Sequence, residues 1–181
     1  MNSKLIIGAV VGGLLLFIWQ FLSWTMLNLH GSNAKYTDKN AEILQLLSTS
    51  LTEDGTYMLP GLPPNATKED QEKMQTEIMG KPWGSVTYHK AYNASMGMNM
   101  GRGLLVNIIA VSLLIWLLMK FPTRSFNSVF VASLAVGIFA YLTNTYPNSI
   151  WFQINTMPDL IDSVVQWSLV GAWLGYWLNR A

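Results

Sequence analysis

Four separate stretches of this chain are apolar enough to lie in a lipid bilayer, and none of them contains lysine or arginine. They are 17 to 25 residues long and cover residues 5–29, 103–119, 127–143 and 160–178. A helix needs about 20 mostly apolar residues to cross the hydrocarbon core, within a range of about 17–25. The pattern therefore predicts an all-α membrane protein with four transmembrane helices.

The overall composition agrees with a membrane protein and excludes several other classes. Of the 181 residues, 51% are hydrophobic and 12% are charged, whereas an ordinary soluble domain has about 25% charged residues. The net charge of +1 gives no clustered basic face for nucleic acid. The chain has no cysteine, which excludes disulfides, thiolate metal sites and cysteine nucleophiles.

The basic residues of the short links predict the orientation of the chain in a bacterial inner membrane. Lys120 and Arg124 lie between the second and third stretches, whereas residues 144–159 contain no lysine or arginine. Because basic residues are retained on the cytoplasmic side, we expect both termini in the cytoplasm and residues 30–102 in the periplasm. Signal peptides have apolar regions of about 7–15 residues, so the longer first stretch is expected to remain as an anchor. Residues 148–157 are too short to span and are expected to lie along the outer interface as an amphipathic segment.

The long segment between the first two stretches is expected to contain two helices. Residues 39–51 carry apolar side chains on one helical face, with Asp38 or Asn40 available as the N-cap. Thr67 and Asp70 have the spacing of a capping box and predict the start of a second helix.

Two short extended segments accompany these helices. Residues 55–59 and 85–90 are typical of strands, so the insertion is predicted to be a small α+β unit with one β-pair. An insertion of this size without disulfides is marginal for independent stability. We therefore expect it to rest on the membrane helices or on a partner.

Small residues four positions apart mark one face on three of the apolar stretches. Such spacing lets two helix backbones approach closely in lipid. The simplest interpretation is contact among the helices of this chain, and the alternative is contact with a partner subunit or a second copy. The pairs are Gly8 with Gly12, Ser133 with Gly137, and Gly171 with Gly175.

Tryptophans lie mostly towards the ends of the apolar stretches. Trp173 and Trp177, for example, are near the end of the last stretch. Aromatic belts at the membrane interface explain such positions without a ligand.

Short motifs along nearly the whole chain resemble a family of uncharacterised bacterial integral membrane proteins. They are FIWQFLSWTML at 17–27 before His30, GTYMLPG at 55–61, and PWG at 82–84 before Tyr88. The resemblance implies a four-helix inner-membrane protein with an extracytoplasmic insertion. It implies no activity and no functional residue.

Three alternating methionines are the most unusual local motif. Met96, Met98 and Met100 precede the second apolar stretch, and thioethers suit Cu(I) when an extended segment lets them converge on one ion. His30 or His89 would complete such a site. The alternative is that the methionines fill gaps where a loop packs onto the helix ends, and no cofactor is then expected.

Two carboxylates begin the fourth apolar stretch. Asp159 is placed as an N-cap, and carboxylates in the first turn of a helix complement its dipole. Asp162 would alternatively be a protonatable functional group at membrane depth. Arg102, expected on the same side of the membrane, is a candidate partner for either carboxylate.

Polar residues within the stretches are expected to face one another. Gln20, Asn107 and Gln166 come from three different stretches, and interhelical hydrogen bonds between such side chains stabilise bundles modestly. The alternative use is a transport path. The absence of internal repeats and of interrupted spans argues against a self-contained transporter.

No nucleophile elbow, P-loop, zinc motif or dinucleotide fingerprint occurs in the sequence. We therefore expect a non-enzymatic accessory, scaffolding or assembly subunit of a larger membrane complex. It would contact lipid and a protein partner, or a second copy, through its helices. The alternatives are a Cu(I)-handling membrane protein and a small channel or transporter.

Overall fold

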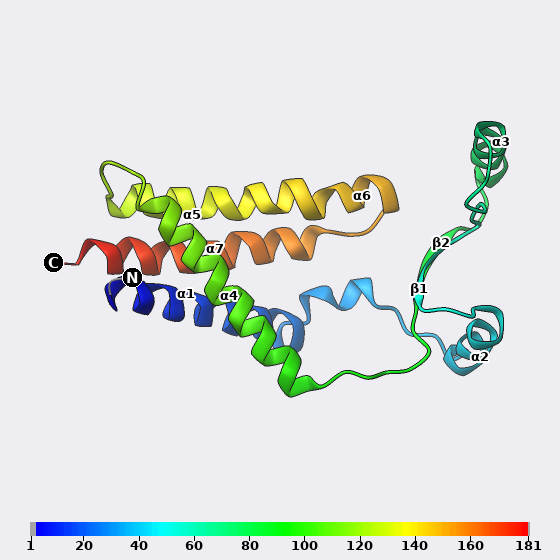
Figure 1. The fold of residues 1–181 in the computed structure, drawn as a ribbon, viewed down its shortest axis with the longest axis horizontal. Helices are drawn as coiled ribbons and strands as arrows, with labels where there is room; N and C mark the ends of the chain where they lie inside the picture. The colour runs from blue at the N-terminus through cyan, green and yellow to red at the C-terminus, as the bar shows by residue number, and fades with distance from the viewer. Residues whose placement is uncertain (1–2, 181) are drawn as a thin grey trace. The chain divides into compact units, whose positions relative to one another are not determined.

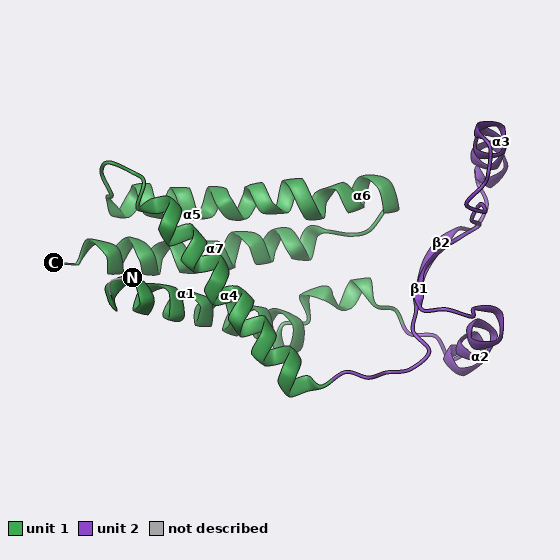
Figure 2. Ribbon diagram, viewed as in Figure 1, with its two compact units in different colours: residues 1–35, 95–181 green, residues 36–94 purple. Residues whose placement is uncertain are grey.

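The computed structural model describes residues 3–180, most of which are helical (Figure 1). The chain divides into two compact units (Figure 2). The described residues up to Lys35 and from Ser95 onward form the first unit, which we call the bundle. Tyr36–Ala94 forms the second, which we call the small unit.

The bundle is built from long helical segments joined by short links. In chain order they are α1 (Ser3–Phe21) with a π-helical turn (Leu22–Met26), α4 (Met96–Leu118), α5 (Phe126–Ala140) with a π-helical turn (Tyr141–Thr145) and α6 (Tyr146–Phe152), and α7 (Met157–Asn179). A 3-10 turn, Leu29–Asn33, follows the first π-helical turn.

Three of these segments are long and apolar enough to cross a membrane. They are Ser3–Met26, Met96–Leu118 and Phe126–Phe152, and they correspond to the first three predicted stretches. The fourth stretch forms α7, which has sufficient length but is not among the three. Its lower hydropathy has a clear source, because α7 carries Asp159, Asp162 and Gln166.

Two predicted boundaries differ from the structure. Residues 148–157 do not form a separate amphipathic segment, because the third helical segment continues through Phe152 and only residues 153–156 link it to α7. The second helix begins at Met96 instead of residue 103. Both helices are longer than hydropathy predicts, since polar residues at their ends still continue the backbone hydrogen bonding.

Helix packing within the bundle centres on α1 and α7. Figure 1 shows α1, α7 and α5 side by side, with α4 crossing them obliquely. α1 contacts both α4 and α7, and α7 also contacts α5. Fully buried aliphatic side chains from three of the helices form the core, namely Val111, Leu118, Val129, Val170 and Leu174.

The predicted small residues lie where these helices approach most closely. A Cβ atom at Gly12 would come within 2.8 Å of the Val111 side chain on α4. On α7, a Cβ at Gly171 would lie 3.1 Å from the backbone oxygen of Phe130, and one at Gly175 would lie 2.9 Å from Phe126. The small residues therefore permit contact among the helices of this chain.

Gly8 and the Ser133–Gly137 pair also lie against neighbouring helices. A Cβ at Gly8 would lie 3.2 Å from Trp177, and one at Gly137 would lie 2.2 Å from the Trp167 ring. Ser133 is fully buried and donates to the carbonyl of Val129.

The small unit contains two helices and one antiparallel strand pair. Its elements are α2 (Asn40–Ser50), β1 (Gly55–Leu59), α3 (Lys68–Ile78) and β2 (Gly84–Tyr88), with Gly55 opposite Tyr88 and Leu59 opposite Gly84. This confirms the predicted small β-pair.

The capping box predicted for α3 is also confirmed. The Thr67 hydroxyl accepts from the backbone N–H of Asp70, and the Asp70 carboxylate accepts from the backbone N–H of Thr67. At the start of α2, neither Asp38 nor Asn40 is the N-cap; Lys39 occupies that position without a side-chain cap.

Candidate functional sites

The bundle contains a buried hydrogen-bonded pair that joins His30, in the 3-10 turn, to Asp162 on α7. His30 Nε2 lies 2.9 Å from Asp162 Oδ2, and Trp19 Nε1 donates to Asp162 Oδ1 at 3.0 Å. His30 is 7% exposed and Asp162 is 8% exposed. Both carboxylate oxygens are thus satisfied, as a charge in such surroundings requires.

A local break in the helix brings His30 back towards α7. Asn28 adopts the left-handed conformation with φ 47°, which asparagine tolerates better than most residues. The 3-10 turn then begins at Leu29. The His30 ring stacks on Trp24 with centroids 4.1 Å apart and an angle of 5° between the rings, which fixes its orientation.

Three amide side chains extend this cluster across three helices. Asn107 Nδ2 donates to Gln20 Oε1 at 2.8 Å. Gln20 Nε2 lies 3.4 Å from both Asn107 Oδ1 and Gln166 Oε1. The expected interhelical contact among these residues is therefore present, and it links α1, α4 and α7.

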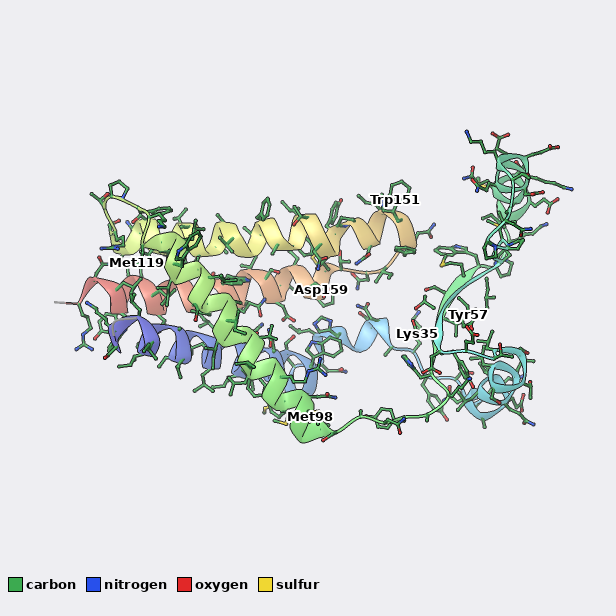
Figure 3. All side chains as sticks on the ribbon, in the orientation of Figure 1. Lys35, Tyr57, Met98, Met119, Trp151 and Asp159 are labelled. Carbon is green, nitrogen blue, oxygen red and sulfur yellow. The ribbon has the colours of Figure 1, made fainter. Side chains whose placement is uncertain are left out.

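A cleft of about 300 Å³ opens beside His30 and Asp162. Its wall includes Gln20, His30, Asp162 and Gln166 of the cluster. The rest of the wall is formed by Trp24, Thr145, Asp159 and Ser163. Trp24 and Thr145 come from the two π-helical turns, and Figure 3 shows Asp159 at the start of α7.

Arg102 is not the partner of Asp162. Asp162 is bonded to His30 and Trp19, whereas Arg102 lines a separate cleft of about 390 Å³ with Gln20, Asn107 and neighbouring residues of α4. The prediction failed because it assumed that charges on the same side would meet. The turn at Asn28 instead supplies a closer partner.

The methionine motif is helical, which contradicts the extended segment expected for it. Met96, Met98 and Met100 lie in the first turns of α4, and Figure 3 shows Met98 there. Successive residues of an α-helix are rotated by about 100°, so the middle side chain points away from the other two. All three are exposed. His30 is bonded to Asp162, and no group of three or more His, Asp or Glu that suits a metal occurs among residues 3–180.

His89 belongs to the small unit and forms an exposed pair there. Its Nδ1 lies 3.3 Å from Asp54 Oδ2, and the backbone N–H of Lys90 donates to Asp54 Oδ1 at 3.0 Å. The hydrogen bond from Lys90, followed by the one from His89, lowers the pKa of Asp54. The contact closes the base of the hairpin.

The small unit has an apolar cleft of about 590 Å³. Residues 56–62, Met74, Ile78 and Trp83 line it. Among residues 36–94, Tyr88 alone is buried. The unit therefore leaves most of its apolar side chains uncovered.

Several contacts important to the bundle were not predicted from the sequence. Trp173 and Trp177 donate their indole N–H groups to the carbonyls of Gly8 and Lys4, at 3.0 and 2.8 Å. These tryptophans therefore bond between helices, beyond the interfacial role expected of them. Gly13, adjacent to a predicted motif, faces the backbone of α4. An aromatic repeat at four-residue spacing on α7 was the available signal for the tryptophans.

Comparisons with known proteins were made for the whole chain. No protein-family model, curated protein or solved structure matches it. The candidate sites are therefore the cleft beside His30 and Asp162 and the apolar cleft of the small unit.

Proposed function

We propose that this protein is a non-enzymatic integral membrane protein that acts as an accessory, scaffolding or assembly subunit of a larger bacterial membrane complex. The observation that carries the proposal is the uncovered apolar surface of the small unit. Tyr88 is its one buried residue among those described, and neither α2 nor α3 has a buried side chain.

A unit of this size cannot be stable on so small a core. Short domains bury a smaller share of their surface than large ones and need additional support. On α2, Leu44 is 61% exposed and Leu46 is 64% exposed. The apolar cleft of the unit brings Met58, Leu59 and Trp83 together, and contiguous exposed apolar surface is typical of protein-binding sites.

The chemistry of the small unit favours a protein partner with apolar side chains flanked by basic residues. The cleft presents Met58, Leu59, Leu62 and Trp83, and tryptophan is enriched among the residues that dominate binding. Residues 36–94 contain eight Asp and Glu and five Lys, so their excess negative charge complements a basic rim. A neighbouring subunit in the same membrane fits this description.

We propose that α7 crosses the bilayer as a fourth span. Its carboxylate at Asp162 accepts hydrogen bonds from His30 and Trp19, and Gln166 bonds to Gln20. Inward-facing and satisfied polar groups reduce the cost of placing a helix in lipid.

Four spans and the distribution of basic residues support an inner-membrane topology with both termini cytoplasmic. Lys120 and Arg124 lie in the link between α4 and α5, whereas residues 153–156 contain no basic residue. Retention of basic links on the inside then puts the small unit in the periplasm. The resemblance to the uncharacterised membrane family is consistent with this topology.

The same observations favour an accessory role over the two alternatives. The methionines of α4 do not converge as a Cu(I) site requires. Gln20, Asn107 and Gln166, the side chains expected to line a pore, are bonded to one another. No separate observation favours copper handling or transport.

The test is to extract the protein from its own membrane in polymer nanodiscs and to measure the mass of the intact particles. We expect a defined stoichiometric complex with a different chain. The Trp83→Ala variant should lose that partner, because the substitution removes an aromatic side chain from the apolar cleft. Tyr92→Ala is the matched control, since Tyr92 is 90% exposed and does not line the cleft.

A lone monomer, or a mass that is a multiple of this chain alone, would contradict the proposal. Retention of the partner by the Trp83→Ala variant would contradict the assignment of the apolar cleft as the binding surface. An unchanged complex in the Tyr92→Ala variant is required for the comparison to count.

A further inference from the structure

The cleft beside His30 and Asp162 contains polar groups without partners. Within residues 3–180, no hydrogen bond involves the carboxylate of Asp159 or the hydroxyls of Thr145 and Ser163. His30, more than nine-tenths buried, lines the same cleft and bonds through Nε2 only. The Asp162 carboxylate therefore has hydrogen-bond partners within the protein, whereas the Asp159 carboxylate and the two hydroxyls line the cleft and have none among the described residues.

The contact with Asp162 determines what His30 offers to the cleft. A carboxylate accepts, so Nε2 carries the proton in the hydrogen bond to Asp162 Oδ2. In the neutral imidazole the other nitrogen, Nδ1, is then an acceptor. Trp19 bonds the second carboxylate oxygen and holds the arrangement in place.

The charges of the cleft favour a cation. Two carboxylates, Asp159 and Asp162, contribute to its wall, which has no lysine or arginine. Trp24 is 62% exposed and adds an aromatic wall, and indole faces attract cations. His30 covers one face of that indole, so a ligand would contact what remains accessible.

The backbone around the cleft is also unusual. Two π-helical turns, Leu22–Met26 and Tyr141–Thr145, each contribute one residue to its wall. Such turns are rare and frequently occur at functional sites. The volume of about 300 Å³ lies at the lower end of the range for small-molecule sites.

We propose that this cleft binds a protonated amine. The ammonium group would donate hydrogen bonds to the Asp159 carboxylate and to His30 Nδ1, with Trp24 alongside. Thr145, Ser163 and Gln166 are available for a neighbouring hydroxyl or ester oxygen. Two sources share this chemistry, namely a lipid headgroup of the ethanolamine type and a free small amine.

The lipid arm of the test uses the full-length protein in membranes of equal amounts of phosphatidylethanolamine and phosphatidylcholine. Native mass spectrometry then identifies retained lipid. We expect phosphatidylethanolamine to be retained over phosphatidylcholine, whose methylated nitrogen has no N–H to donate. The preference should be about tenfold or more, the size of one charge-assisted hydrogen bond.

The free-amine arm uses the protein in phosphatidylcholine alone. Titration with ethanolamine should raise the melting temperature if the ligand is a free amine. Asp159→Asn should abolish whichever response the wild type gives. Asp38→Asn is the matched control, because Asp38 is exposed in the small unit and should leave the response unchanged.

The two arms separate the sources and can overturn the proposal. Selective retention of phosphatidylethanolamine that is lost in Asp159→Asn supports a lipid amine, and ethanolamine stabilisation lost in that variant supports a free amine. No selectivity in either arm, or the same selectivity in Asp159→Asn, would overturn it. The melting temperature of Asp159→Asn without amine shows that the variant is folded.

Discussion

Asp162 is an acidic residue in the buried part of the bundle. Its carboxylate is almost completely buried and depends on His30 and Trp19 for its hydrogen bonds. Breaking a buried pair by removing one partner is destabilising, because the polar group that remains is buried without a hydrogen-bond partner. Replacing both partners by apolar residues avoids that penalty.

A double-mutant cycle measures this coupling. We expect Asp162→Leu to lower the free energy of unfolding by about 1–3 kcal/mol, because it leaves the N–H groups of His30 and Trp19 without acceptors. When Asp162→Leu is combined with His30→Leu, the free energy of unfolding should fall by less than the sum of the two single losses. Unfolding of the purified protein in increasing SDS provides the measurement.

The exposed pair of the small unit is the control for this cycle. The side chains of His89 and Asp54 are 65% and 55% exposed, so Asp54→Asn should not change stability measurably. If Asp162→Leu behaved like Asp54→Asn, or if the two bundle substitutions were additive, the buried pair would not contribute as described.

The sequence identified Asp162 and the three amide residues as candidate polar contacts, but it did not predict the contact between Asp162 and His30. The amides were identified because each is a polar residue in an apolar stretch. The His30 contact was not predicted, because it depends on the left-handed turn at Asn28. A single residue with positive φ redirects the chain without any signal in hydrophobic periodicity.

Among the helices, close backbone approach determines the packing of α1 on α4. A Cβ at Gly13 would lie 2.8 Å from the backbone Cα and N of Ile108. Real Cβ atoms do not approach backbone so closely, and a backbone cannot rotate away as a side chain can. The two helices would have to separate.

Gly13→Ala should therefore destabilise the bundle. Overpacking of this kind costs about 1–3 kcal/mol, measurable as a lower melting temperature in detergent. Gly101→Ala on α4 is the matched control, since a Cβ there meets nothing within 4 Å. It should be neutral or stabilise α4 by up to about 1 kcal/mol. Equal effects of the two substitutions would argue against the packing of α1 on α4.

In the small unit, the capping box makes the start of α3 sensitive to acid. The backbone N–H of Thr67, and then its hydroxyl, lower the pKa of Asp70. A lowered pKa in the folded state means that the contribution is present above the unfolded pKa. It is lost as the pH falls through the folded pKa.

Hydrogen exchange of the α3 amides in the full-length protein tests this cap. Thr67→Ala should accelerate exchange roughly fivefold at neutral pH, the effect of losing one N-cap, and less in acid. Thr76→Ala is the control, because the Thr76 hydroxyl bonds only to the carbonyl of Glu72 within the helix. Equal exchange in the two variants would count against the capping box.

Helix existence was predictable, and helix ends were less so. Hydropathy located the first three long segments, and the Thr67–Asp70 spacing located α3. The third segment was predicted to end at residue 143, because the apolar stretch ends there. A π-helical turn, Tyr141–Thr145, directly precedes α6, and the helix continues to Phe152.

In the whole molecule, the two units differ in what stabilises them. The bundle buries a continuous aliphatic core and satisfies most of its polar groups internally. The small unit leaves its apolar residues exposed, so its stability depends on whatever covers them. Composition predicted this division, since nearly all charged residues lie outside the apolar stretches. It could not predict the clefts, which arise from contacts between distant residues.

Whether α7 crosses the membrane as the fourth span that we propose can be measured directly. The chain has no cysteine, so single-cysteine variants can be labelled without background. The variants are Thr52→Cys in the small unit, Thr123→Cys between α4 and α5, Ile154→Cys between α6 and α7, and Asn179→Cys at the end of α7. The reagent is a membrane-impermeant maleimide applied to intact spheroplasts.

With four spans and both termini in the cytoplasm, we expect Thr52→Cys and Ile154→Cys to be labelled from outside. Thr123→Cys and Asn179→Cys should react only after the membrane is permeabilised. Labelling of Asn179→Cys from outside as fast as Ile154→Cys would show that α7 does not cross the membrane and would contradict the proposed fourth span.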